Sequence, residues 1–290
     1  MTDLPLRALL GVFRLMHHLP LSVLAPMGRG LGRVLFLASR ERRHVVRTNL
    51  ALCFPHWTDA ERESVARRHF QCFGRALLES SIAWFGSEER LRSVVRLEDW
   101  HHVPPDGRFI LLVPHFAALD LEGIRLTLEY RGIAVYAHQK NRFFDEFLLR
   151  VRSRFNGAKL IARNEGVKSI LRGYRDGYSL QLSPDMDLGA RDSIFVPFFG
   201  VETATVTALS RIARLTRAPI VPVVIRQLPG GEGYVIRAYP AWDNYPGDSV
   251  EDDTRRMNAF IEARILEMPE QYLWLHKRFK TRPEGAPRVY

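Results

Sequence analysis

The first 38 residues are dominated by apolar side chains, interrupted at intervals by arginine and histidine. Arg7, Arg14 and His18 recur at helical spacing, and the apolar residues between them fall mostly on the other side of a helix. The longest stretch without Lys, Arg, Asp or Glu covers 15–28, which is shorter than the ~18–20 residues of a plain transmembrane helix. We therefore expect an amphipathic helix in a membrane interface; the alternative is a first helix packed on the protein's own core. Since no small-residue cleavage site follows, we do not predict a secretory signal.

Beyond this segment, the hydrophobic pattern changes from helical periodicity to alternating strands and helices. A helix is predicted over 60–84, with Thr58 and Asp59 at its capping positions. The strands expected after it are 109–113, 133–137, 159–162, 178–182, 220–225 and, at an edge, 234–238, and the helices are 121–130, 144–155, 167–174, 205–216 and 250–266. This alternation predicts an α/β fold: a mixed, mostly parallel sheet flanked by helices, with a helical N-terminal region.

No Pro-, Gly- or Ser-rich linker and no internal repeat divides the 290 residues. We expect a membrane-associating helical segment over 1–38 and one folded domain over 39–290. Cys53 and Cys72 belong to no CxxC or Cys/His cluster. They are therefore predicted to be small buried thiols, not a disulfide or zinc ligands.

The chain carries 42 Lys and Arg against 32 Asp and Glu, a net charge of +10 with a sequence pI near 10.0. Such a field favours an anionic partner: nucleic acid, anionic lipid or an acidic carrier protein. Because no zinc finger, RNP motif or zipper repeat is present, a nucleic-acid partner is not predicted. Early cations (Arg40, Arg42, Arg43 and Arg47) follow the apolar segment, as expected beside the cytoplasmic face of a membrane.

The segment 113–120 carries the candidate chemistry. His115 follows a predicted buried strand, where open α/β sheets place their ligands, and Asp120 falls near the start of the next helix. With His115 in the turn, the Asp120 carboxylate can fold back onto the imidazole. A histidine can remove a hydroxyl proton near neutral pH, and a carboxylate on its far nitrogen fixes the tautomer. Because no GxSxG motif supplies a nucleophile, direct attack by an acceptor hydroxyl is the simpler reaction.

His115-x4-Asp120 resembles the HX4D/E signature of the glycerolipid and lysophospholipid acyltransferase superfamily. Five further blocks, in the expected order, resemble the lauroyl and myristoyl acyltransferases of late lipid A biosynthesis: 43–55, 163–172, 184–187, 195–200 and 271–283. They span nearly the whole chain. Many members carry Glu at the second position of the dyad, where this chain has Asp120; Glu122 is an alternative partner for His115.

The resemblance implies an acyltransferase at the cytoplasmic face of an inner membrane, with no cofactor and no metal. The acyl donor would be acyl carrier protein, and the acceptor a lipid A precursor of the Kdo2-lipid IVA type. His115 would be the general base and Asp120 its orienting group. The substrate-binding residues expected are Arg163, Asn164, Lys168, Asp185, Asp187 and Arg278.

Other segments have two interpretations each. The block 195–200 either lines the acyl or glycan end of the site or forms a rigid loop on the core. His276 belongs to a basic, aromatic tail and is expected to be structural or substrate-binding, not a second base. Alternative functions are acylation of another membrane lipid (a lysophospholipid, a glycolipid or an ornithine lipid), a hydrolase, or a non-catalytic membrane binder.

Overall fold

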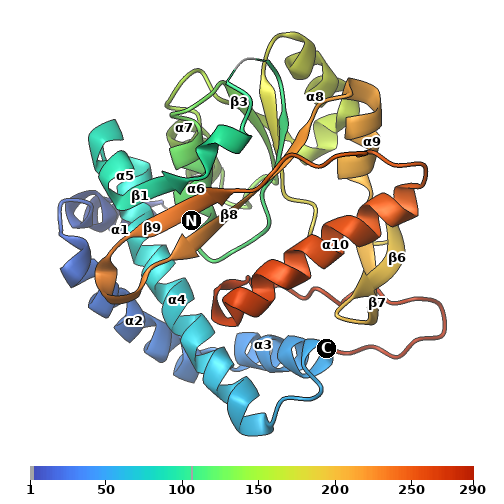
Figure 1. Cartoon of the computed structure of the whole chain (residues 1–290). Helices are drawn as coiled ribbons and strands as arrows, with labels where there is room; N and C mark the ends of the chain where they lie inside the picture. Colours follow the sequence, from blue (N-terminus) through green and yellow to red (C-terminus); the bar gives the residue numbers. More distant parts are fainter. Residues whose placement is uncertain (1–2, 106) are drawn as a thin grey trace.

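The apolar runs of the middle of the chain form one seven-stranded sheet in this computed structural model, which describes residues 3–105 and 107–290 (Figure 1). The strand order is β1-β9-β8-β2-β5-β3-β4, and only the β8–β9 pair is antiparallel. The strands are β1 (Val95–Glu98), β2 (Ile110–Leu112), β3 (Gly132–Tyr136), β4 (Lys159–Ala162), β5 (Ser179–Leu182), β8 (Ile220–Gln227) and β9 (Tyr234–Ala238). The predicted fold class, a mixed and mostly parallel sheet, is confirmed.

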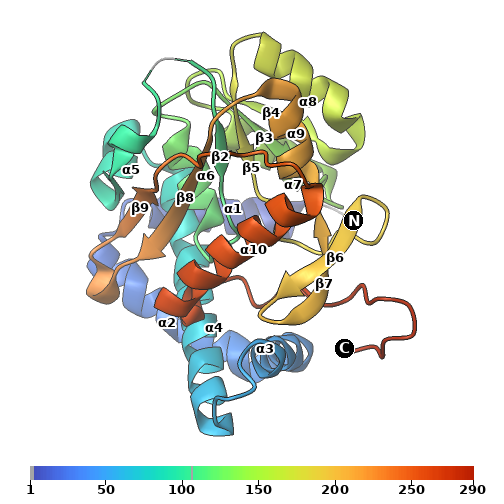
Figure 2. The ribbon, with the colours of Figure 1, turned by 45° about the vertical axis from the view of Figure 1, so that its right-hand side comes forward.

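Helices cover both faces of this sheet. The N-terminal region forms α1 (Leu4–Met16), α2 (Leu21–Ala38), α3 (Arg40–Cys53), the long α4 (Asp59–Phe85) and α5 (Glu88–Val94). The later helices are α6 (Leu119–Leu126), α7 (Arg142–Arg152), α8 (Gly166–Arg175), α9 (Ala208–Thr216) and α10 (Val250–Glu267). In Figures 1 and 2, α6 and α7 lie on the same side of the sheet as α4, and α10 lies on the other side with α9. The predicted capping of α4 is confirmed, since Thr58 and Glu61 form a capping box.

Two segments differ from the expected elements. Segment 234–238 is not an edge strand, because β1 pairs with it on the outside. The helix expected from residue 205 begins only at Ala208, because Thr205 belongs to a hairpin of β6 (Ser193–Phe198) and β7 (Val201–Val206). The block 195–200 lies in this hairpin, and the buried Phe198 ring packs near Phe279. Both cysteines are free, as expected.

Glycines allow α2 to pack closely against α4. A Cβ at Gly32 would come within 2.2 Å of the Phe70 carbonyl oxygen, and one at Gly28 within 2.4 Å of the Arg75 Cα. Gly74, on α4, faces both of these glycines. The buried side of α2 is therefore held by backbone-to-backbone contact, while its other side stays exposed.

We expect Gly32→Ala to lower the free energy of unfolding by about 1–3 kcal/mol, because its methyl group would have to displace the α4 backbone. Gly30 is the matched control on the same helix, since a Cβ there meets nothing within 4 Å. Gly30→Ala should be neutral or stabilising by up to ~1 kcal/mol through helix propensity. Chemical denaturation of both variants tests this, and equal effects would contradict the close packing.

His69 links the stability of the fold to pH. It lies fully buried on α4 and donates from Nδ1 to the Glu270 carbonyl at 3.0 Å. Burial lowers its pKa to about 4, whereas an unfolded histidine titrates near 6.5. Between these values the unfolded chain binds the proton, so stability is lost as pH falls from about 6.5 to about 4.

Protonation of His69 should lower the free energy of unfolding by up to about 3 kcal/mol over this pH range. Denaturation midpoints measured between pH 7 and pH 4.5 test it. His69→Gln should flatten the acid slope, and His44→Gln, at an exposed helical position, should leave it unchanged. A slope unaffected by His69→Gln would contradict the assignment.

Candidate active site

Four neighbouring parallel strands, β2, β5, β3 and β4, end at the same edge of the sheet. Their carboxyl ends bring together residues far apart in the sequence. His115 follows β2, Asp185 follows β5, and Arg163 follows β4. Open α/β sheets place their ligands at this edge.

His115 is held in place by two segments that are distant in the sequence. Its ring Nδ1 donates to Oδ1 of Asp185 at 2.7 Å, and its backbone N–H donates to Oδ2 of the same carboxylate at 2.9 Å. The C-terminal segment also bonds to this loop, since the backbone N–H of Leu273 donates to the His115 carbonyl at 3.0 Å. With Nδ1 bonded to Asp185, the ring presents Nε2 as a proton acceptor.

Asp185 is fully buried and acts as the anchor of this arrangement. Besides the two bonds from His115, it accepts one from the Tyr272 hydroxyl at 3.1 Å. Burial by itself would raise the pKa of Asp185, but interactions with His115, and more weakly with Arg278, outweigh it and lower the pKa to about 2. The residue is therefore a carboxylate at neutral pH, suited to fix the His115 tautomer and to stabilise an imidazolium.

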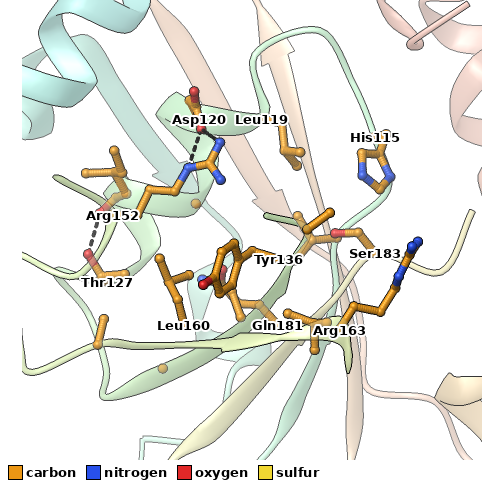
Figure 3. Close-up of a pocket in the computed structure, with 18 of the residues that line it drawn as sticks. His115, Leu119, Asp120, Thr127, Tyr136, Arg152, Leu160, Arg163, Gln181 and Ser183 are labelled. Carbon is orange, nitrogen blue, oxygen red and sulfur yellow. Dashed lines mark hydrogen bonds and ion pairs between the residues drawn. The ribbon is translucent and has the colours of Figure 1, made fainter. Parts of the chain in front are cut away.

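The expected contact between Asp120 and His115 is not formed. Oδ1 of Asp120 instead accepts two bonds from Arg152, at 2.6 and 2.9 Å. Figure 3 shows the Asp120 carboxylate turned to Arg152, with His115 at the other side of the cavity. The reason is local: α6 begins at Leu119, so Asp120 already lies in the helix and faces the end of α7.

Glu122, the alternative partner for His115, also makes no such contact. Its side chain is fully buried, and both carboxyl oxygens lack a hydrogen-bond partner among residues 3–105 and 107–290. Burial first, and the nearby charge of Asp185 second, raise its pKa well above the usual range. Burial therefore favours the protonated form of Glu122, and its side chain does not contact His115.

A cavity of about 250 Å³ opens beside His115 and runs between the sheet and α6. Its lining is mainly apolar or small. From the sheet it includes Val113, Gly132, Ala134, Tyr136, Leu160, Gln181 and Ser183, and from the helices Leu119, Asp120, Gly123, Ile124, Thr127 and Arg152. His115, Ser183 and Arg163 lie at one end, and Thr127 lies toward the other (Figure 3). An apolar slot with a histidine at its mouth suits a substrate with a hydrocarbon chain.

The expected substrate-binding residues fall into two groups. Arg163 lines the mouth of the cavity; Asn164 and Lys168 are exposed on the same turn and helix but do not line it. Asp187 and Arg278, in contrast, are buried. Their role in binding a substrate stays a prediction, and the structure shows both side chains bonded within the protein.

Hydrogen bonds explain why these two side chains are buried. Asp187 accepts from the backbone N–H of Thr281 at 2.6 Å and from its hydroxyl at 2.8 Å. Arg278 donates to the Ala204 carbonyl at 2.7 Å and to the Thr205 hydroxyl at 2.8 Å. These four bonds hold the C-terminal tail against the domain.

His276 fits the structural interpretation that the sequence favoured. Its Nε2 accepts from the backbone N–H of Asp187 at 2.9 Å. Burial, followed by the charges of Arg278 and His115, lowers its pKa to about 4. A neutral, hydrogen-bonded ring in this place supports the loop after β5 and is not a second base.

Sequence reasoning missed Arg152, Tyr272 and Gln181 as residues of the site. Tyr272 and Arg152 come from distant segments, and only the folded chain brings them to Asp185 and Asp120. The sequence did contain a signal for Gln181, because this polar residue stands between Leu180 and Leu182 in a strand that is predicted to be buried. Such a side chain in a buried strand needs a partner, which is the Tyr130 hydroxyl at 2.7 Å.

Together, the fold and this site define an α/β enzyme with a histidine–aspartate pair at the mouth of an apolar slot. Comparison with known proteins is consistent with that class. The family model described as bacterial lipid A biosynthesis acyltransferase matches residues 6–281. The chain belongs to this family and is an acyltransferase.

Curated relatives cover almost the full chain. It is 36% identical to the lipid A biosynthesis lauroyltransferase of Escherichia coli (strain K12) over 286 residues, 97% of this chain and 93% of that one. Identity to the palmitoleoyltransferase of the same organism is 34%, covering 97% and 92%. Identity to its myristoyltransferase is 32%, covering 92% and 83%.

Among solved structures, a 1-acyl-sn-glycerophosphate acyltransferase from Thermotoga maritima is similar with a TM-score of 0.41 at 16% identity. The match covers 85% of this chain and 96% of that chain.

Proposed function

We propose that this protein transfers a fatty acyl chain from an acyl carrier protein thioester to a hydroxyl of a lipid A precursor of the Kdo2-lipid IVA type. The observation that carries the proposal is the His115–Asp185 pair at the mouth of an apolar slot, in a chain of this family. The names of the curated relatives support the choice of acceptor.

In the proposed reaction, Nε2 of His115 accepts the proton of the acceptor hydroxyl as its oxygen attacks the thioester carbonyl. A C–O bond forms and the C–S bond breaks. His115 then returns the proton to the leaving thiolate, so the imidazole is regenerated without a covalent acyl-enzyme. Asp185 accepts from Nδ1 throughout and stabilises the imidazolium.

Two cations flank this reaction. Arg163, exposed at the mouth, is placed to bind a phosphate or another anionic group of the acceptor, with Asn164 and Lys168 beside it. Arg152 lies in the cavity wall and is held there by Asp120. In this proposal Asp120 acts through Arg152 and does not orient His115.

The donor is proposed to be acyl carrier protein because the chain is strongly basic. Three of the four early arginines (Arg40, Arg42, Arg43 and Arg47) bond within the protein, which leaves fewer free donors there for a docked partner. Arg42 donates to the Leu275 carbonyl at 3.2 Å, Arg43 to the Leu37 carbonyl at 3.0 Å, and Arg47 to Glu63 at 2.8 Å. Arg163 and the other exposed cations near the cavity mouth are better placed for the thioester donor.

The membrane surface is proposed to bind the apolar side of α1 and α2. Large hydrophobic side chains are exposed there: Leu4, Leu9, Val12 and Leu15 on α1, and Val23, Met27, Val34 and Leu37 on α2. By length and composition, α2 is the one described helix that could cross a membrane. Its glycine contacts with α4 instead favour a segment that lies in the interface of the inner membrane, on the cytoplasmic side.

This apolar side lies close to the site. Asn141, before α7, donates to Asp3 at 3.0 Å, and the Arg7 guanidinium lies 4.3 Å from the Phe143 ring centroid. The start of α1 is thereby tied to the loop that follows β3, at the edge where the cavity opens. A lipid acceptor held in the membrane would reach His115 without leaving the membrane completely.

Replacement of Leu15 and Leu37 by Glu should reduce flotation with anionic vesicles at least several-fold, because both exposed side chains would enter the interface in the proposed bound state. Leu266→Glu is the control, a leucine on α10 that is also largely exposed. Unchanged flotation of the double variant would contradict the proposed membrane surface.

The reaction itself is tested with purified protein in detergent, a panel of acyl carrier protein thioesters and several acceptors, read by mass spectrometry. We expect Kdo2-lipid IVA to gain the mass of one acyl chain. If only a lysophospholipid, a glycolipid or an ornithine lipid gains this mass, the proposed acceptor is wrong. If free fatty acid is released without any acylated acceptor, the reaction is hydrolysis and not acyl transfer.

A further inference from the structure

The central strand β8 is longer than its neighbour β2, so the end of β8 has one side without a strand partner. The pairing of β2 with β8 ends where Leu112 lies opposite Pro222. The chain then leaves β2 to form the His115 loop, whereas β8 continues to Gln227. Past Pro222, no strand of the described chain pairs with β8 on the side of β2. The buried backbone at Gln227 therefore needs another hydrogen-bond partner.

The side chain of Gln271 is that partner. Its Oε1 accepts from the backbone N–H of Gln227 at 2.7 Å, and its Nε2 donates to the carbonyl of the same residue at 3.0 Å. Because a side-chain amide carries both a donor and an acceptor, it forms the reciprocal pair of bonds that a neighbouring strand would form. Gln271 is only 8% exposed, so both bonds are shielded from water.

The backbone beside Gln271 holds the His115 loop. The N–H of Ala117 donates to the carbonyl of Gln271 at 2.8 Å, and the N–H of Leu273 donates to the carbonyl of His115 at 3.0 Å. We refer to residues 271–273 as the bracing segment. It lies against the loop as a short strand would, and the Gln271 side chain attaches it to the end of β8.

The two other side chains of the bracing segment do not bond to β8. Tyr272 pairs with the loop at Phe116 and donates to Asp185, so its contacts belong to the site itself. The side chain of Leu273 is apolar. Beyond the segment, Asn49 of α3 donates to the carbonyl of Trp274 at 2.8 Å. This bond holds the following residues without Gln271, so loss of the Gln271 amide should loosen the bracing segment and leave the rest of the tail in place.

We propose that Gln271 is a positioning residue for His115. Asp185 holds the ring and the backbone N–H of His115, and Gln271, through the bracing segment, holds the His115 carbonyl. The two attachments together keep Nε2 of the ring directed at the acceptor hydroxyl. The inference rests on the proposed function, because it assigns Gln271 to the reaction of His115. A displacement of about 1 Å in a reacting group can cost about a hundredfold in rate.

Gln271→Met tests this role, and Gln227→Met is the matched control. Methionine has nearly the volume of glutamine but no amide, so Gln271→Met removes both bonds to β8. Gln227 is 9% exposed, and its side chain donates to the Tyr234 hydroxyl at 3.0 Å. Since Gln271 bonds only to the backbone of Gln227, Gln227→Met makes the same change in an equally buried place and leaves the bracing segment attached.

With acyl carrier protein thioesters and Kdo2-lipid IVA as substrates, Gln271→Met should lower kcat about ten- to a hundredfold. Its KM should change less than about threefold, because Gln271 does not line the cavity. Gln227→Met should change both constants less than about threefold, even if it lowers the thermal unfolding midpoint as much as Gln271→Met does. Equal losses of kcat in the two variants, or a change in KM alone, would overturn the inference.

A second readout does not depend on turnover. The Nδ1 proton that His115 donates to Asp185 should give a far-downfield proton NMR signal, assigned by its absence from His115→Ala. Gln271→Met should shift or broaden this signal, and Gln227→Met should leave it unchanged. An unchanged signal in Gln271→Met would also overturn the inference. If the wild type transfers no acyl chain, the proposed function fails, and the NMR comparison still decides whether Gln271 positions His115.

Discussion

Asp185→Asn is expected to lower kcat by about 10²–10⁴-fold with little change in KM. Asparagine keeps the size of the side chain but loses its charge. It can also present an N–H to the ring, so Nδ1 would no longer be fixed as the donor. His115 would then expose the wrong nitrogen to the acceptor, and its imidazolium would lose its carboxylate partner.

Two controls separate this effect from general loss of structure. Tyr272→Phe removes one hydrogen bond to Asp185 but leaves His115 paired, so it should cost less than tenfold. Asp187→Asn removes a carboxylate that is almost equally buried but bonds to Thr281, so it should affect thermal stability more than kcat. Wild-type kcat in a folded Asp185→Asn protein would show that His115 does not depend on this pair.

Asp120→Asn and Arg152→Gln are each expected to lower kcat/KM about ten- to a hundredfold, and the double variant should lose little more. Asp120 and Arg152 form one ion pair in the cavity wall, and each side chain remains about a quarter exposed. Removing either partner leaves the other charge unpaired, so their effects should be strongly non-additive.

The double-variant cycle decides between two roles for Asp120. If Asp120 oriented His115 directly, Asp120→Asn would cost as much as Asp185→Asn, and Arg152→Gln would not reproduce the loss. Full additivity of the two single effects would also contradict the pairing in the cavity wall.

The fold was largely predictable because its strands are short, buried and apolar. Segments 109–113, 133–137 and 159–162 gave β2, β3 and β4 within a residue or two. β1 was missed because a four-residue strand with Arg96 and Glu98 has no buried pattern and forms only by pairing with β9. The β6–β7 hairpin was missed because Pro197 and the Phe-Phe-Gly sequence are typical of a loop.

The position of His115 followed from the sequence, since a histidine after a buried strand must lie at the carboxyl edge of the sheet. Its partner did not. Spacing along the chain favoured Asp120, five residues away, whereas the neighbour in space is Asp185, 70 residues away in the loop that follows the adjacent strand. Strand order decides which loops meet, and hydrophobic pattern alone does not determine strand order.

The role of His115 is tested by acyl transfer from acyl carrier protein thioesters of 6 to 16 carbons to Kdo2-lipid IVA, comparing the wild type with His115→Ala at equal concentrations of folded protein. We expect one added acyl chain with the wild type and a rate lower by about a thousandfold or more in the variant. Equal rates for the two proteins would contradict the role of His115.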